Sequence, residues 1–282
     1  MRITTLIEND GLADRDDLVA EFGLSLHVDT GESQVLFDTG TSGAFADNAA
    51  TLGIDLGAVD VAVLSHQHFD HGGGLERFLE INQRAKVYLR QSNVVNRFFK
   101  GLTEEARPIG LDLSLFDRFS DRFQFVIDTT EIAPGIFLLT EIPSIHERPK
   151  GNSHLFVEKG GRLHQDPFDH ELVMVVRDLD GLVVFSGCSH HGILNMIEAA
   201  TDHWPGEWIR SVVGGFHLIG LPIANSMADS RAQVEEIGRR ILEIGPAKVY
   251  TSHCTGEKAF NVLSDVMGDT LESFHTGSII EV

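Results

Sequence analysis

The sequence predicts a layered α/β fold in which helices cover the outer faces of β-sheets. Short β-rich runs alternate with helical stretches along all 282 residues. The hydrophobic fraction of 42% and the charged fraction of 23% are close to those of globular proteins, which argues against disorder, collagen or a coiled coil as the main architecture. Strands dominate each half of the chain and helices follow them, which is typical of sheets with helices on their outer faces.

In the first half of the chain, the clearest signals are a hairpin and one continuous apolar run. Leu24–Val28 and Gln34–Phe37 flank the turn sequence Thr30-Gly31-Glu32-Ser33, which predicts the hairpin. Val59–Leu64 is apolar throughout, as expected for a strand buried on both faces. The other elements expected here are helices at Gly43–Leu52 and Leu75–Asn82 and strands at Lys86–Leu89, Phe123–Ile127 and Gly135–Leu139.

The second half repeats this pattern. Leu172–Val176 and Leu182–Phe185 flank Asp180-Gly181, a strong hairpin signal. Apolar residues recur at helical spacing in Asp229–Glu243, which makes this the clearest helix. The other elements expected here are strands at Ser211–Val213 and Ala247–Thr251 and helices at Gly192–Ala200 and Glu257–Met267.

Two segments near 98–122 and 141–169 are poor in regular signals, and we expect them to be irregular caps over a functional cleft. No linker separates independent units, so a single domain over residues 1–282 is predicted. The chain has neither a signal-peptide pattern at its start nor an apolar run of membrane-spanning length, so a cytoplasmic location is expected.

The charge balance limits the partners. Lys and Arg number 22 and Asp and Glu number 42, which gives a formal net charge of −20. Such an average field repels nucleic acid and acidic membranes, so neither is expected as a partner. A local basic pocket can still bind a small anion, and a small-molecule substrate is expected. The sequence does not indicate the oligomeric state.

The strongest chemical signal is Ser65-His66-Gln67-His68-Phe69-Asp70-His71, which directly follows the apolar run Val59–Leu64. Three histidines and one aspartate therefore lie together at a strand-to-helix turn. Imidazole nitrogens and carboxylate oxygens are the ligands that divalent Zn, Mn and Fe prefer. The cluster predicts a metal site.

This stretch resembles the HxHxDH signature of the metallo-β-lactamase superfamily, and the resemblance extends over nearly the whole chain. It implies a four-layer αβ/βα sandwich with two divalent ions, zinc in the first place and manganese or iron as alternatives, at one edge between the halves. It also implies that His66 and His68 bind one ion and that Asp70 and His71 bind the other.

The same resemblance implies further site residues. Asp38, in Leu36-Phe37-Asp38-Thr39-Gly40, corresponds to an aspartate that orients a metal-binding histidine. His170 lies eighteen residues before Cys188, close to the family spacing, and is assigned as the third ligand of the first ion. His253 follows the last expected strand and is assigned to the second ion.

Cys188 departs from the family pattern, because it stands where the superfamily has a bridging aspartate. A thiolate there binds or bridges soft metals and favours zinc over hard cations. Otherwise a hydroxide alone links the ions, or only one site fills tightly. The alternative is a small buried cysteine at a strand end with no metal role.

His190 and His217 follow apolar runs in glycine-containing turns, so both are expected to line the pocket. They are candidates for substrate phosphate binding, general acid catalysis or metal ligation, and the alternative is a hydrogen-bonded scaffold role. Asp70 or His217 is expected to shuttle the proton.

A narrower resemblance rests on Gly187-Cys188-Ser189-His190, Gly214-Gly215-Phe216-His217-Leu218 and His253-Cys254-Thr255-Gly256. These segments are similar to a branch named for an archaeal dihydropteroate-synthase-like enzyme. Three functions follow as hypotheses: a hydrolase that acts on a small phosphate-bearing metabolite through a metal-activated water, a pterin-type transferase that joins a dihydropterin methyl diphosphate to an aminobenzene ribofuranosyl phosphate, and a non-catalytic metal- or ligand-binding sensor. Aromatic residues of the two cap segments, including Phe98, Phe99, Phe156 and Phe168, are expected to stack on a flat substrate ring.

Overall fold

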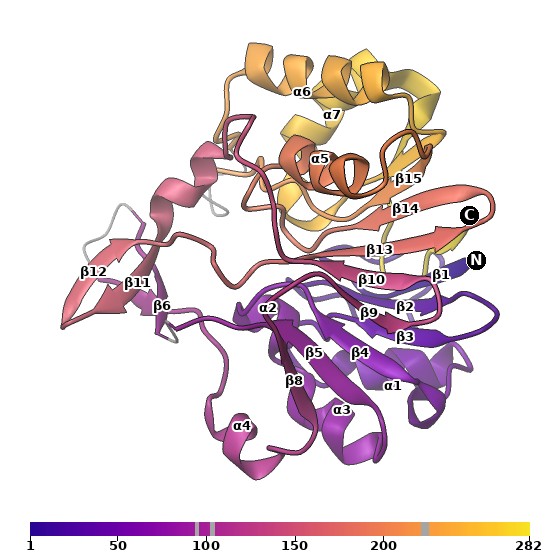
Figure 1. Ribbon diagram of the computed structural model, residues 1–282, viewed down its shortest axis with the longest axis vertical. Coiled ribbons are helices and arrows are strands. Elements are labelled where there is room, and N and C mark those ends of the chain that lie inside the picture. The colour runs from indigo at the N-terminus through magenta and orange to yellow at the C-terminus, as the bar shows by residue number, and fades with distance from the viewer. Residues whose placement is uncertain (94–95, 102–104, 221–225) are drawn as a thin grey trace.

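A computed structural model describes residues 1–93, 96–101, 105–220 and 226–282, and two seven-stranded sheets face each other in it (Figure 1). The first sheet has the order β18-β1-β2-β3-β4-β5-β8, with the bounds Ile279–Glu281, Arg2–Ile7, Ser25–Asp29, Gln34–Phe37, Val61–Leu64, Lys86–Arg90 and Phe123–Val126. The second has the order β17-β16-β15-β14-β13-β10-β9, with the bounds Leu271–Glu272, Lys248–Tyr250, Ile209–Val213, Gly181–Phe185, Val173–Asp178, Ile136–Leu139 and Thr130–Ala133.

Helices cover the outer face of each sheet (Figure 1). Helices α1 (Ala44–Thr51) and α3 (Leu75–Ile81) pack on the first sheet, and α5 (Ile193–His203), α6 (Arg231–Ile244) and α7 (Glu257–Met267) pack on the second. The four-layer αβ/βα sandwich predicted from the sequence is thereby confirmed. None of the helices in the described part of the chain is long and apolar enough to cross a membrane.

Three buried clusters fill the three interfaces between the four layers, and strand alternation explains how one strand serves two of them. In β14, Leu182 and Val184 pack towards the helices, while Val183 and Phe185 pack between the sheets. Successive side chains of a strand point to opposite faces, so a strand buried on both faces is apolar at every position. This is why the central strands were recognisable as continuous apolar runs.

A third sheet of four short strands projects from one side of the sandwich, at the left of Figure 1. Its order is β12-β11-β6-β7, with the bounds Arg162–Gln165, Leu155–Lys159, Arg97–Phe99 and Arg107–Pro108. The two segments expected to be irregular caps therefore pair with each other, and the first also forms α4 (Ser114–Arg118). The expectation of irregular structure was wrong there because strands of two to five residues carry little local signal. Residues 102–104 of the first segment lie outside the described residues.

Candidate metal centre

The side chains singled out from the sequence lie on loops that follow the carboxyl ends of parallel strands. Asp38 directly follows β3, His66 follows β4, and Cys188, His217 and His253 follow β14, β15 and β16. Strands β3 and β4 are parallel, as are β14, β15 and β16, so in each sheet these loops emerge at one edge. Short helix α2 (Phe69–Gly72) continues the His66 loop between the two halves, on the side where the third sheet projects (Figure 1).

Four buried donors form one cluster: Asp70, His71, Cys188 and His253. The Nε2 atom of His71 lies 3.2 Å from the Cys188 sulfur and 3.2 Å from Nε2 of His253. Oδ2 of Asp70 lies 3.5 Å from Nε2 of His253 and 3.7 Å from Nε2 of His71. A tetrahedral zinc ion with bonds of about 2.0–2.3 Å separates its donors by about 3.3–3.8 Å. The donor set therefore fits one ion.

His66, His68 and His190 form a second cluster, in which one ring nitrogen of each lies within 4.8 Å of the others. The Nε2 atom of each ring is buried and has no hydrogen-bond partner among the described residues. Buried polar atoms without partners are rare in folded proteins, and a ligand between them accounts for them. Three imidazoles that face one another suit a divalent transition metal.

Hydrogen bonds to the opposite ring nitrogen orient four of these histidines in the same way. Nδ1 of His71 lies 2.6 Å from an Asp38 oxygen, and Nδ1 of His66 lies 2.9 Å from the Ser65 hydroxyl. Nδ1 of His190 faces the amide oxygen of Asn152 at 2.9 Å, and Nδ1 of His253 faces that of Asn9 at 3.0 Å. Each Nδ1–H donates to its oxygen, so in the neutral ring the Nε2 lone pair is directed into the centre, as a metal ligand requires.

The two ring nitrogens of His170 have the opposite hydrogen-bonding roles. Its Nδ1 accepts the backbone N–H of Gln67 at 3.0 Å, so its proton resides on Nε2, which faces Asp166 at 3.3 Å. A ring nitrogen of His170 does lie within 4.8 Å of donor atoms in His68 and Asp166, but both of its nitrogens are engaged within the protein. The resemblance assigns His170 to the place beside His66 and His68, and in the structure it is His190 that forms a three-donor group with those two residues. Sequence spacing alone could not choose between them, because both residues border the β13–β14 hairpin.

Glu171 holds the loop that presents His190. Its buried carboxylate accepts the backbone N–H of His190 at 2.7 Å and that of His191 at 2.8 Å, and it also contacts Nδ1 of His191 at 2.7 Å. No motif in the sequence marked Glu171 or Asn152 as an orienting group. A charged residue directly before the apolar run Leu172–Val176 was the one available signal for Glu171.

His217 lies at the edge of the second cluster. Its ring meets that of His190 with a centroid separation of 4.2 Å, and both of its ring nitrogens are buried without a partner among the described residues. A Cβ atom on Gly151 would come within 3.2 Å of the imidazole, so the glycine allows this close approach. One ring nitrogen of His217 also lies within 4.8 Å of donor atoms in Cys188 and His190, so these three residues form a further group of potential metal donors.

Burial and neighbouring charges set the protonation of these groups. Burial lowers the pKa of His66, His68, His170 and His190, which favours neutral rings. Burial also lowers the pKa of His71, but the Asp38 and Asp70 carboxylates outweigh it and raise that pKa to about 9. Burial raises the pKa of Asp70, but His71 and His253 outweigh it and hold that pKa below its usual value. Burial and the neighbouring Cys254 raise the pKa of the Cys188 thiol.

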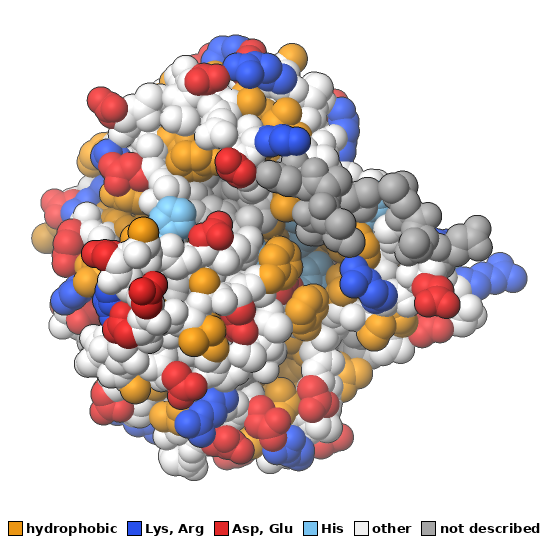
Figure 2. Space-filling model, turned by 180° about the vertical axis from the view of Figure 1, so that it is seen from behind, with side chains coloured by type: hydrophobic (Ala, Val, Ile, Leu, Met, Phe, Trp, Pro, Cys, Tyr) orange, Lys and Arg blue, Asp and Glu red, His pale blue; other side chains and the backbone are white. Residues whose placement is uncertain are grey.

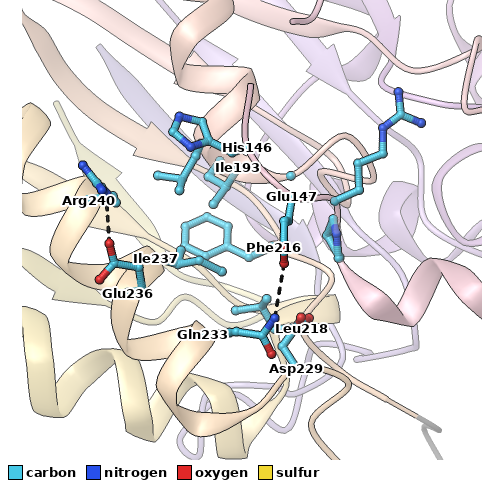
Figure 3. Close-up of a pocket in the computed structure, with 14 residues that line it drawn as sticks. His146, Glu147, Ile193, Phe216, Leu218, Asp229, Gln233, Glu236, Ile237 and Arg240 are labelled. Atoms are coloured by element: carbon cyan, nitrogen blue, oxygen red, sulfur yellow. Dashed lines mark hydrogen bonds and ion pairs between the residues drawn. The ribbon is translucent and has the colours of Figure 1, made fainter. Parts of the chain in front are cut away.

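A separate cavity of about 250 Å³ lies beside this centre (Figure 3). Phe216 and Leu218, the chain neighbours of His217, line it together with Ile193 of α5 and Ile237 of α6. At its rim, Gln233 donates a hydrogen bond to Glu147. No residue of the two donor clusters lines this cavity.

Comparison with known proteins gives consistent matches over most of the chain. The sequence model of the metallo-beta-lactamase superfamily matches residues 19–253. The 7,8-dihydropterin-6-methyl-4-(beta-D-ribofuranosyl)-aminobenzene-5'-phosphate synthase of Methanocaldococcus jannaschii is 30% identical over 274 residues, 93% of this chain and 90% of that protein. A crystal structure described as a metal-dependent hydrolase of the beta-lactamase superfamily is 33% identical, with a TM-score of 0.81 over 100% of this chain and 99% of that one. Zn(2+)-bound PqqB from Methylobacterium extorquens shares the fold at 10% identity, with a TM-score of 0.59 over 100% of both chains.

Proposed function

This chain belongs to the metallo-β-lactamase superfamily, and from that premise we propose that it is a metal-dependent hydrolase of a small, anionic, phosphate-bearing metabolite. Members of this superfamily typically bind divalent metals, and the described residues include four overlapping groups of potential donors, of which two that share no residue are taken here as ion sites. The observation that carries the proposal is the common orientation of His66, His71, His190 and His253, each with Nδ1 bonded to an oxygen and Nε2 directed inwards.

We assign two ions to the two clusters. The first is held by His66, His68 and His190, and the second by Asp70, His71, Cys188 and His253. The sulfur donor favours zinc, while manganese and iron are the alternatives that the histidine and carboxylate donors also suit. The second cluster offers four protein donors and the first offers three, so the first has room for a further ligand.

When bound, a pair of divalent ions supplies Lewis acidity and lowers the pKa of water. The protein contributes orientation and proton transfer. Asp38, Asn152 and Asn9 fix the histidine rings, so the donors need little rearrangement on binding. Both ring nitrogens of His217 lack a hydrogen-bond partner among the described residues, and the ring lies beside His190, where it can hold a proton for the leaving group.

A second function is favoured by the relative of 30% identity, which is named a synthase. In that case the same donors would hold ions that favour departure of diphosphate from a dihydropterin methyl diphosphate, and the aminobenzene ribofuranosyl phosphate would replace water as the acceptor. The donor clusters serve both reactions, so the acceptor distinguishes them.

Metal analysis and a substrate panel test the proposal. Purified protein loaded with zinc should carry two ions per chain and release phosphate from small phosphate esters. His66→Ala and His190→Ala should each reduce the metal content, whereas the matched control His164→Ala, at an exposed position, should not. Formation of a condensed pterin product only when the aminobenzene acceptor is present would favour the synthase. Efficient cleavage of long RNA without turnover of any small phosphate compound would contradict both functions.

A further inference from the structure

Two large apolar side chains are exposed beside the metal centre. Of the phenylalanines in this chain, which all lie in its described part, three are exposed: Phe22 at 42%, Phe69 at 37% and Phe125 at 48%. Phe22 and Phe69 adjoin residues of the donor clusters, whereas Phe125 lies on β8. Single exposed apolar side chains are common on protein surfaces, so it is the position of these two beside the donor residues, and not their exposure alone, that suggests a function.

The contacts of Phe22 place it against the second cluster. Its ring centroid lies 5.1 Å from that of His253, with the planes tilted by 46°. The adjacent chain runs along the backbone of Asp70, because the N–H of Leu24 donates to the Asp70 carbonyl at 3.1 Å. A Cβ atom on Gly23 would lie 2.6 Å from the same carbonyl oxygen, so a glycine is required for this close approach.

Phe69 lies in the chain between His68 of the first cluster and Asp70 of the second. Its backbone is fixed at the start of α2, where its N–H donates to the Ile109 carbonyl at 2.9 Å. Since the Phe22 segment packs on the Asp70 backbone, the two exposed rings belong to adjoining segments of the chain. Figure 2 shows a hollow on the face that it presents, with histidine colour within it and hydrophobic side chains along its border.

An aromatic residue beside the first cluster is not available to a ligand. Phe168, expected from the sequence to stack on substrate, is only 1% exposed. Its ring is already stacked on His190, with a centroid separation of 4.3 Å and an interplanar angle of 9°. Phe168 therefore supports the first cluster, whereas Phe22 and Phe69 have rings exposed to solvent. The other rings expected to stack on substrate, Phe98, Phe99 and Phe156, are half-buried on β6 and β11 of the third sheet.

We propose that Phe22 and Phe69 form an aromatic border of the metal centre that binds the planar ring of the substrate and so selects aromatic over aliphatic phosphate compounds. This inference rests on the proposed function for the position of the phosphate. Aromatic rings attract one another in offset or edge-to-face contacts beyond the effect of buried area, whereas a saturated ring of equal size gains only the area. The selectivity is therefore for planarity and not for size.

Binding of a matched pair of inhibitors tests this without requiring turnover. Phenylphosphonate and cyclohexylphosphonate have the same number of carbons and the same anionic group, and their affinities for the zinc-loaded protein are measured by calorimetry. We expect the phenyl compound to bind more tightly. Phe22→Leu and Phe69→Leu should each weaken phenylphosphonate by about 2–13-fold while changing cyclohexylphosphonate much less.

Phe125→Leu is the matched control, because it removes an equally exposed ring away from the centre. Metal content and thermal midpoint are measured for every variant, and Phe22→Trp, which keeps an aromatic ring, should retain the preference for phenylphosphonate. Equal losses for both inhibitors, or no loss in either leucine variant, would overturn the inference. If phosphate esters are not hydrolysed but the inhibitor preference follows the two rings, the aromatic border stands and the proposed reaction fails.

Discussion

Asp38→Asn should damage metal binding through a change of tautomer in His71. The buried carboxylate of Asp38 accepts three hydrogen bonds: from the backbone N–H of Ser65 at 2.7 Å, from the Ser65 hydroxyl at 2.7 Å and from Nδ1 of His71 at 2.6 Å. An asparagine of the same shape can still accept the backbone N–H. Its amide group then faces Nδ1 of His71 as a donor, which moves the imidazole proton to Nε2 and removes the lone pair from the centre.

The magnitude follows from these contacts. Loss of one charge-assisted hydrogen bond costs about 1.5–3 kcal/mol of unfolding free energy in the metal-free protein. Replacing the partner of a metal-binding histidine typically weakens metal affinity by about 10–100-fold. Metal affinity is measured by competition with a chelator at fixed pH, and unfolding free energy is measured in urea without metal.

The control for this variant is Asp202→Asn, which removes a carboxylate from an exposed position. We expect it to change neither quantity. An Asp38→Asn protein that unfolds more easily but binds both ions with unchanged affinity would refute the orienting role of Asp38.

Three further predictions concern the same centre. In the metal-free protein, burial lowers the folded-state pKa of four histidines: His66, His68, His170 and His190. Because the unfolded chain then binds more protons below pH about 6.5, the free energy of unfolding should fall as the pH drops from 7 to 5. Urea unfolding measures this as a lower midpoint, and a midpoint that does not change with pH would contradict it. His71 acts oppositely, since its folded-state pKa is raised to about 9 and its contribution to stability is lost as the pH rises from about 6.5 through 9. Cys188→Asp should retain two ions but shift the metal preference from zinc towards manganese. Loss of the second ion from this variant in competition assays would show that an aspartate oxygen cannot replace the Cys188 sulfur as a ligand. His170→Gln should keep the full metal content, whereas His190→Ala should lose an ion. Loss of an ion from the His170 variant and not from the His190 variant, in metal quantification, would identify His170 as the ligand.

Local sequence patterns predicted most of the sandwich. The expected helix Glu257–Met267 has the same bounds as α7, and the expected strand Val59–Leu64 contains β4. Both depend on the side-chain periodicity of a single element, which is readable without knowledge of the fold. The third sheet was not readable in this way, because strand β6 pairs with β11 more than fifty residues later and neither has a clear alternation.

The same distinction holds at the site. The metal-ligand motif His66 to His71 could be predicted because its candidate ligands are neighbours in the chain. The choice between His170 and His190 depends on where a loop returns: Ser189 has φ of 61° and Gly192 has φ of 89°, and this turn brings His190 to His66. Such positive φ values are set by tertiary contacts, including the Glu171 carboxylate, and leave no reliable mark in the sequence.

The central claim is that two ions occupy the two donor clusters, with His190 and not His170 beside His66 and His68. X-ray diffraction from crystals of the zinc-loaded protein, with anomalous data collected on both sides of the zinc absorption edge, tests it most directly. Two anomalous peaks are predicted. One lies within about 2.0–2.3 Å of donor atoms in His66, His68 and His190, and the other within the same reach of Asp70, His71, Cys188 and His253. A peak bound by His170 and Asp166, or an absence of zinc from the Cys188 cluster, would contradict the account.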